Sequence, residues 1–111
     1  MADFTIQELF ESMPRYANES AIQDVDKTIQ WELTGEEPGY YYLEVKDGTV
    51  TTHEGQADNP DATIVTPSEL WKRIATGQEN GAVAFMSGKF KATGDLSLLM
   101  KMQNWFEVPR Q

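Results

Sequence analysis

Apolar and polar residues alternate along residues 27–53, and this alternation limits the fold more than any other feature of the sequence. A period of two residues places every second side chain on the same face, which is typical of strands with one buried face. The turn residues 35–39 and the Asp47-Gly48 dipeptide divide the segment into three strands. The sequence therefore predicts a three-strand antiparallel meander whose apolar face must be covered by other elements. The apolar positions are Ile29, Trp31 and Leu33 in the first strand and Tyr41, Leu43 and Val45 in the second.

A helix is predicted ahead of this meander. Thr5 and Glu8 have the spacing of a capping box, and Pro14 is expected to kink or end the helix. The apolar residues between them recur at helical spacing and form one face. We interpret this face as core packing. Its members are Ile6, Leu9, Phe10 and Met13.

Further elements follow the meander. Residues 62–65 are rich in β-branched side chains and are predicted as a fourth strand. Thr66 is the expected N-cap of the next helix and Pro67 its first residue, and the helix is expected to end at Gly77.

A shorter helix is predicted to begin after the N-cap Asn80, followed by a fifth strand over residues 89–93 and a last helix capped by Asp95. The order of elements predicts one α+β domain over residues 1–111, with a five-stranded, mainly antiparallel sheet covered by helices.

The last predicted helix carries more apolar residues than one sheet face covers. At about 100° per residue, these residues span an arc on the order of 220°. Such an arc needs a second apolar surface, which neighbouring helices, a partner chain or a ligand would supply. The residues are Leu96, Leu98, Leu99, Met100, Met102, Trp105 and Phe106.

Charge and residue types exclude several classes of function. The chain has 18 acidic and 9 basic residues, a formal net charge of -9, and no cysteine. The negative charge disfavours nucleic acid and a standing attachment to anionic membranes. His53 is the only histidine, so we predict no metal site and no cofactor, and we interpret His53 as a surface or structural residue. The alternative, an acid/base role for His53 beside an apolar pocket, lacks a recognisable partner group.

The run AFMSGKFKATGD at residues 84–95 resembles the signature of the sterol carrier protein 2 family. The order of elements upstream is also similar to that family over nearly the whole chain. The resemblance implies a five-stranded sheet with helices on one face, enclosing an apolar cavity for sterols, fatty acids, acyl-CoAs or other lipids. The chain ends Pro109-Arg110-Gln111, which is not a peroxisomal signal, and its start lacks the features of a signal peptide, so we expect a stand-alone cytoplasmic protein.

The predicted function is to bind and shield a hydrophobic ligand in an internal tunnel, without catalysis. Expected partners are a small lipid and, transiently, a membrane or an enzyme. The alternative is an interaction module whose last helix docks on an enzyme or forms a homodimer. We also predict that the last helix serves as both a wall and a lid of the cavity, because only one connection would restrain it. The predicted ligand-binding residues are Leu70, Ile74, Phe85, Met86, Phe90, Leu98, Leu99, Met102, Trp105 and Phe106.

Overall fold

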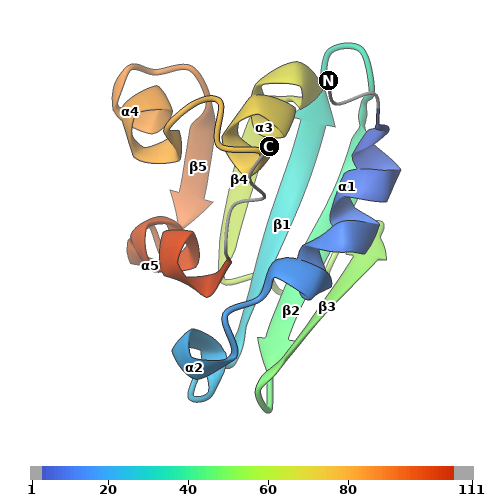
Figure 1. The fold of residues 1–111 in the computed structure, drawn as a ribbon. Helices are drawn as coiled ribbons and strands as arrows, with labels where there is room; N and C mark the ends of the chain where they lie inside the picture. The colour runs from blue at the N-terminus through green and yellow to red at the C-terminus, as the bar shows by residue number, and fades with distance from the viewer. Residues whose placement is uncertain (1–3, 107–111) are drawn as a thin grey trace.

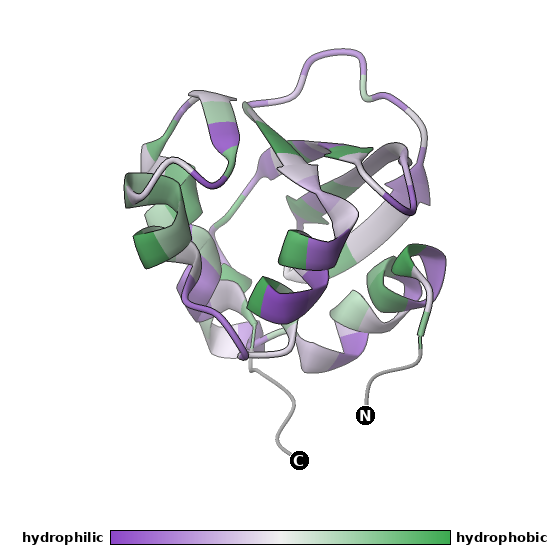
Figure 2. Ribbon diagram, turned by 90° about the horizontal axis from the view of Figure 1, so that it is seen from above, coloured by the Kyte–Doolittle hydropathy of each residue, from purple (hydrophilic) through white to green (hydrophobic). Residues whose placement is uncertain are grey.

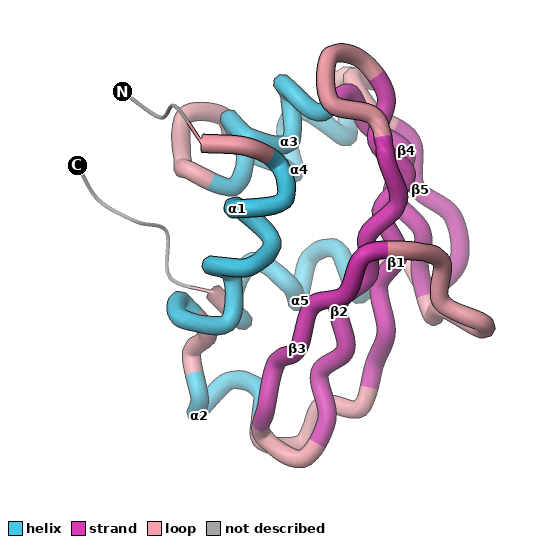
Figure 3. The backbone as a smooth tube through the Cα atoms, turned by 90° about the vertical axis from the view of Figure 1, so that its right-hand side faces the viewer, coloured by secondary structure: helices cyan, strands magenta, loops and turns pink. Residues whose placement is uncertain are grey.

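The computed structural model describes residues 4–106, which form a five-stranded sheet covered on one face by helices. Figure 3 shows the helices in one layer and the strands in the other. The predicted α+β class is confirmed. The C-terminal residues 109–111 lie outside the described part of the chain. In chain order the elements are α1 (Ile6–Ser12), the 3-10 helix η1 (Met13–Tyr16), α2 (Glu19–Ile22), β1 (Lys27–Thr34), β2 (Gly39–Lys46), β3 (Thr49–Glu54), β4 (Ala62–Pro67), α3 (Ser68–Ala75), α4 (Gly81–Met86), β5 (Lys91–Gly94) and α5 (Ser97–Trp105).

The sheet has the strand order β3-β2-β1-β4-β5 (Figure 1). The predicted meander is confirmed, since β2 pairs antiparallel with both β1 and β3. β4 returns to the other side of β1 and pairs with it in parallel, while β5 pairs antiparallel with β4. The sheet is therefore mixed, and β1 lies at its centre.

Aromatic side chains fill the space between the helices and the centre of the sheet. The Phe10 ring stacks on Tyr41 at a centroid distance of 4.6 Å and meets Trp31 edge-on at 5.3 Å. Trp31 in turn contacts Trp71 of α3 at 5.1 Å. These contacts join α1 and α3 through the sheet, and Tyr41 faces the core as the alternation predicts, whereas Tyr40 is exposed.

The prediction that only one face of β1 is buried is wrong at Gln30. Its side chain lies on the face away from the helices and is only 4% exposed. Its Nε2 donates to the carbonyl oxygens of Tyr41 at 2.9 Å and Gly55 at 3.0 Å. Its Oε1 accepts from the Ala57 amide at 2.7 Å. The loop after β3 therefore folds over this face, and one amide side chain satisfies the backbone groups there.

Two predicted N-caps are each wrong by one residue, because the caps are Pro67 for α3 and Leu96 for α5. Thr66 lies within β4, because pairing with β1 continues through Pro67, and α3 begins only at Ser68. α5 begins at Ser97, and Asp95 precedes the cap position, although its Oδ1 still accepts from the Ser97 amide at 3.2 Å. The predicted caps Thr5 and Asn80 are confirmed by their side-chain hydrogen bonds.

The fifth strand begins at Lys91, two residues later than predicted, because the Lys89 amide still donates to the Ala84 carbonyl of α4 at 2.9 Å. The helix α2 was not predicted. Its four residues are too few to show a helical period in the sequence.

Gly94, at the end of β5, lies where no larger residue fits. Its φ is +88°, and a Cβ atom there would lie 2.5 Å from the Asp61 carbonyl oxygen. Gly88 has a similar φ of +78° but open space around it. We expect Gly88→Ala to cost about 1–2 kcal/mol of unfolding free energy from backbone strain alone, and Gly94→Ala distinctly more because of the added clash. Urea unfolding of both variants checks this, and equal losses would contradict the close approach at Gly94.

Candidate functional site

An apolar pocket of about 980 Å³ lies between the helices and the sheet. Figure 2 shows that the surrounding helices carry both hydrophobic and hydrophilic segments, as amphipathic helices do. The walls come from α1 and η1, from α3 and α4, and from α5, while β4 and the segment before β5 each contribute one buried side chain. The principal apolar side chains are Leu9, Met13, Ile64, Trp71, Ile74, Phe85, Phe90, Leu99, Met102 and Phe106.

The pocket is open to solvent rather than closed. Met86 and Met100 line it and are nevertheless 85% and 60% exposed, so they form part of its rim. The charged residues around it are also at the rim, where Glu8, Glu11 and Arg15 are exposed. The interior is therefore apolar, and the charges remain in contact with water. An enclosed cavity is not what the structure shows.

Glu79 is the most buried of the charged residues around this pocket, and it is fully paired. Its two carboxylate oxygens lie 2.7 Å from Lys89 Nζ and 3.1 Å from Arg73 Nε. Hydrogen bonds from Lys89 and then from Arg73 hold the pKa of Glu79 below its ordinary value. Glu79 is therefore an ionised structural contact between the α3–α4 loop and the segment after α4, not a proton donor.

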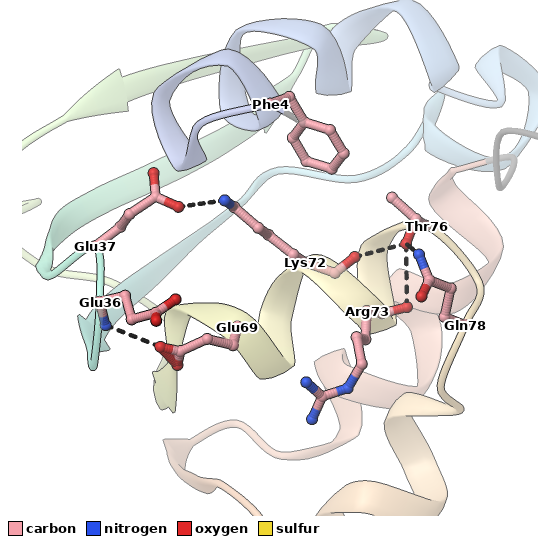
Figure 4. A pocket seen from close by; sticks show the side chains of 8 residues that line it. All are labelled: Phe4, Glu36, Glu37, Glu69, Lys72, Arg73, Thr76 and Gln78. Carbon is pink, nitrogen blue, oxygen red and sulfur yellow. Dashed lines mark hydrogen bonds and ion pairs between the residues drawn. The ribbon is translucent and has the colours of Figure 1, made fainter. Parts of the chain in front are cut away.

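A smaller polar pocket of about 340 Å³ adjoins the apolar one and shares Phe4 and Thr76 with it (Figure 4). Glu37 forms an ion pair with Lys72 and accepts from the Ile6 amide at 2.8 Å. Lys72 Nζ also lies 5.6 Å from the centre of the Phe4 ring. The Lys72 contact, followed by the Ile6 amide, lowers the pKa of Glu37. These contacts tie the β1–β2 turn to the start of α1 and to α3, and so hold one end of the apolar pocket together.

Seven of the ten predicted ligand-binding residues line the apolar pocket, and three do not. Leu70, Leu98 and Trp105 are only 4%, 1% and 3% exposed and are buried in the core instead. Leu98 and Trp105 are seven residues apart, so they share the face of α5 opposite to its solvent side. The residues that line the pocket are Ile74, Phe85, Met86, Phe90, Leu99, Met102 and Phe106.

The wall formed by α1 and η1 is one part of the pocket that the sequence interpretation missed, and Trp71 of α3 is another. Leu9, Met13 and Tyr16 line the pocket, although the apolar face of this helix was interpreted as core packing. Their spacing of four and then three residues is a helical stripe beside the core residues Ile6 and Phe10. The stripe is present in the sequence, but only the neighbouring helices decide which part of it faces a pocket.

The last helix was predicted to be a lid because only one connection would restrain it. In the structure a second contact restrains the C-terminal end of α5. The Asn18 amide donates to the Trp105 carbonyl at 2.6 Å, and Ala17 pairs with Phe106 in an isolated β-bridge. α5 is therefore restrained at both ends, and its role as a lid stays a prediction without its original basis.

His53 lies far from the pocket, on the other face of the sheet. The neighbouring Thr52 donates to the Phe10 carbonyl on the helix side, so His53 points away from the helices. Its Nε2 lies 3.1 Å from a Glu44 oxygen, and its ring stacks on Tyr42. Within residues 4–106 no three histidine or acidic residues come together as a metal site, and no helix has the length and apolarity needed to cross a membrane.

The family model described as the SCP-2 sterol transfer family matches residues 6–107, nearly the whole described chain. The chain belongs to this family. This confirms the resemblance seen in residues 84–95. As an SCP-2 domain it is a member of a lipid-binding and lipid-transfer family.

Two of the similar proteins are much longer than this chain. A hydroxysteroid dehydrogenase-like protein 2 from Xenopus tropicalis is 31% identical over 99 residues, which are 88% of this chain and 24% of that protein. The sec-alkylsulfatase Pisa1 from Pseudomonas is 18% identical, with a TM-score of 0.82 over 96% of this chain and 17% of the other. The chain thus spans about a quarter or less of these relatives. A domain-sized relative, the sterol carrier protein domain 2 of Helicoverpa armigera, is 25% identical, with a TM-score of 0.67 over 88% of this chain and 79% of the other.

Proposed function

We propose that this SCP-2 domain binds a hydrophobic ligand in the apolar pocket and holds it for storage or transfer. The observation that supports this is the lining of the pocket, whose buried side chains are apolar, whereas Glu8, Glu11 and Arg15 are exposed at the rim and Glu79 is neutralised by two ion pairs. Its volume of about 980 Å³ is at the upper end of the range typical of small-molecule sites. Covering about 300 Å² of ligand at about 25 cal/mol per Å² contributes roughly 7 kcal/mol before the costs of binding. A fatty acid, an acyl-CoA, a sterol or a related lipid fits this description.

The proposed ligand contacts are the seven predicted residues that line the pocket, together with three side chains from the walls that the sequence interpretation left out. Leu9 of α1 and Met13 of η1 supply one side, and Trp71 supplies the α3 side. All three are buried in the described structure, so they offer a dry apolar surface at the inner part of the pocket.

Catalysis is not part of the proposal. His53 lies on the opposite face of the sheet, and Glu79 is held ionised by two cations. No nucleophile with an adjacent base is therefore brought to the pocket by the described residues. Two expectations from the sequence stay predictions: that residues 1–111 form a single domain, and that the protein is cytoplasmic.

The test is to purify the protein under native conditions, extract it with organic solvent and identify any bound lipid by mass spectrometry. We expect about one lipid per chain, or, for a protein emptied of lipid, saturable binding of a fluorescent fatty acid or sterol. A protein that carries no lipid and binds neither probe would overturn the proposal.

A second candidate function, an accessory interaction module, is favoured by one observation. The relatives from Xenopus tropicalis and Pseudomonas contain the similar region as a minor part of a longer chain. Light scattering distinguishes the two functions. A stable dimer that dissociates in Met100→Asp, from a protein that binds no lipid, would favour assembly over lipid binding.

A further inference from the structure

The helix α4 is the wall of the apolar pocket with the fewest buried side chains. Ala84 is its one buried residue, whereas Val83 and Met86 are 60% and 85% exposed. The helices α1 and α3 each bury three residues, and α5 buries two and has a second contact at its C-terminal end. A helix with little buried surface is displaced at a lower cost than its neighbours, so α4 is the wall that moves most easily.

The two ends of α4 are packed differently. Gly81, its first residue, lies so close to α3 that a Cβ atom there would be 3.2 Å from Ile74 Cγ2. After the other end, residues 87–89 are exposed, and a Cβ atom at Gly88 would have no other atom within 4 Å. The N-terminal end of α4 is therefore packed on α3, and the packing leaves its C-terminal end free to move outward.

Polar contacts of three residues restrain this C-terminal end. The Lys89 amide donates to the Ala84 carbonyl at 2.9 Å, so Lys89 moves with the end of α4. Lys89 Nζ lies 2.7 Å from one oxygen of Glu79, and Arg73 Nε of α3 lies 3.1 Å from the other. The Glu79 amide also donates to the Arg73 carbonyl at 3.1 Å, which fixes Glu79 to α3. We call Arg73, Glu79 and Lys89 the Glu79 clasp, because together they tie the end of α4 to α3.

The end of α4 that the clasp restrains also borders the mouth of the pocket. Phe85 lines the pocket, and Met86 lines it while being largely exposed. Figure 1 shows α4 at a corner of the molecule, where it follows α3 and precedes β5. The mouth is already open to solvent, so an outward movement of this end of α4 would widen an existing entrance.

We infer that α4 is the pocket wall that moves outward when a ligand enters or leaves, and that the Glu79 clasp sets the rate of this movement. The inference rests on the proposed lipid-binding function. The contacts of the clasp exist while α4 is docked and are broken when its end is displaced, whether or not the pocket holds a ligand. The clasp therefore slows entry and exit by the same factor and leaves the Kd unchanged.

Stopped-flow binding of a fluorescent fatty acid methyl ester tests the inference, since an uncharged ligand does not respond to the altered charges itself. Arg73 and Lys89 do not line the apolar pocket. Arg73→Gln and Lys89→Gln should each raise the association and dissociation rate constants about threefold, and the double variant about tenfold, with the Kd within about twofold. The matched control is Lys91→Gln, because Lys91 is exposed and has no ion-pair partner within residues 4–106. It makes the same change in net charge and should leave both rate constants unchanged.

Two further measurements identify the moving element and the contacts that restrain it. Hydrogen exchange of the α4 amides should be faster in the double variant than in the unaltered protein, while exchange of the α5 amides stays the same. Added salt screens exposed ion pairs, so it should raise the rate constants of the unaltered protein and not those of the double variant. Circular dichroism verifies that each variant is folded.

Three results would overturn the inference. They are a double variant with the rate constants of the unaltered protein, an effect of Lys91→Gln equal to that of Lys89→Gln, and faster hydrogen exchange in α5 rather than in α4. In each case the unaltered protein still binds the ligand, so the proposed function stands and the role of α4 is wrong. An unaltered protein that binds neither the ester nor a fluorescent fatty acid or sterol would refute the proposed function, and the inference with it.

Discussion

Met102→Trp is expected to weaken fatty-acid binding about fifteenfold while the domain remains folded. Met102 lies on α5, is half-buried and lines the apolar pocket. A larger ring at this position extends into open pocket volume rather than into packed core, so the fold has room for it. Displacing about two methylene groups of a bound chain costs about 1.6 kcal/mol, which corresponds to this change in Kd.

Asn104→Trp is the matched control for this variant. It introduces the same ring on the same helix, but Asn104 is exposed and does not line the pocket. Displacement of a fluorescent fatty acid gives the Kd of both variants, and thermal unfolding verifies their stability. Equal affinities for the two variants would show that α5 does not form a wall of the binding site.

Phe10→Ala is expected to lower the unfolding free energy by about 3–5 kcal/mol, the range typical of truncating a buried phenylalanine. Phe10 is 2% exposed, and its ring is in contact with both Tyr41 and Trp31. Removing the ring leaves a cavity between α1 and the sheet that neither aromatic neighbour can fill by a small shift. A domain of this size has about 5–15 kcal/mol in total, so the variant should be close to its unfolding threshold.

The control for this loss is Tyr40→Ala, on the strand that contains Tyr41 but on its opposite face. Tyr40 is 45% exposed, so its removal should change stability by no more than about 1 kcal/mol. Urea unfolding followed by tryptophan fluorescence measures both variants. A similar loss for each would mean that the stacked cluster around Phe10 is not the centre of the core.

The part of the pocket formed by the last helix could be predicted from the sequence, because that helix has more apolar surface than one sheet face covers. Leu99, Met102 and Phe106 line the pocket as the wide apolar arc of the last helix indicates. Leu98 and Trp105 belong to the same arc but are buried in the core. An arc reports how much apolar surface exists and not which neighbour covers each part of it, so the sequence could not separate wall from core.

The wall from α1 was missed for the same reason. Leu9 belongs to the buried core and also lines the pocket. Its spacing from the other apolar residues of the helix is the same whether it contacts the core or a pocket. The assignment depends on how far α1 stands from α4 and α5, which are separated from it by more than sixty residues of sequence. No sequence pattern within α1 indicates how far this helix lies from α4 and α5.

The sequence by itself determined the local structure: the capping box of Thr5 and Glu8, the cap at Asn80, and the one-sided alternation of β2, which places Tyr41 inward and Tyr40 outward. Each of these depends on atoms a few residues apart. Only the tertiary structure decided that β4 pairs in parallel with β1, that Gln30 is buried beneath a loop, and that Leu9 of α1 lines the same pocket as Met102 of α5. These features are contacts between segments distant in the chain, and they form only where the assembled sheet brings those segments together.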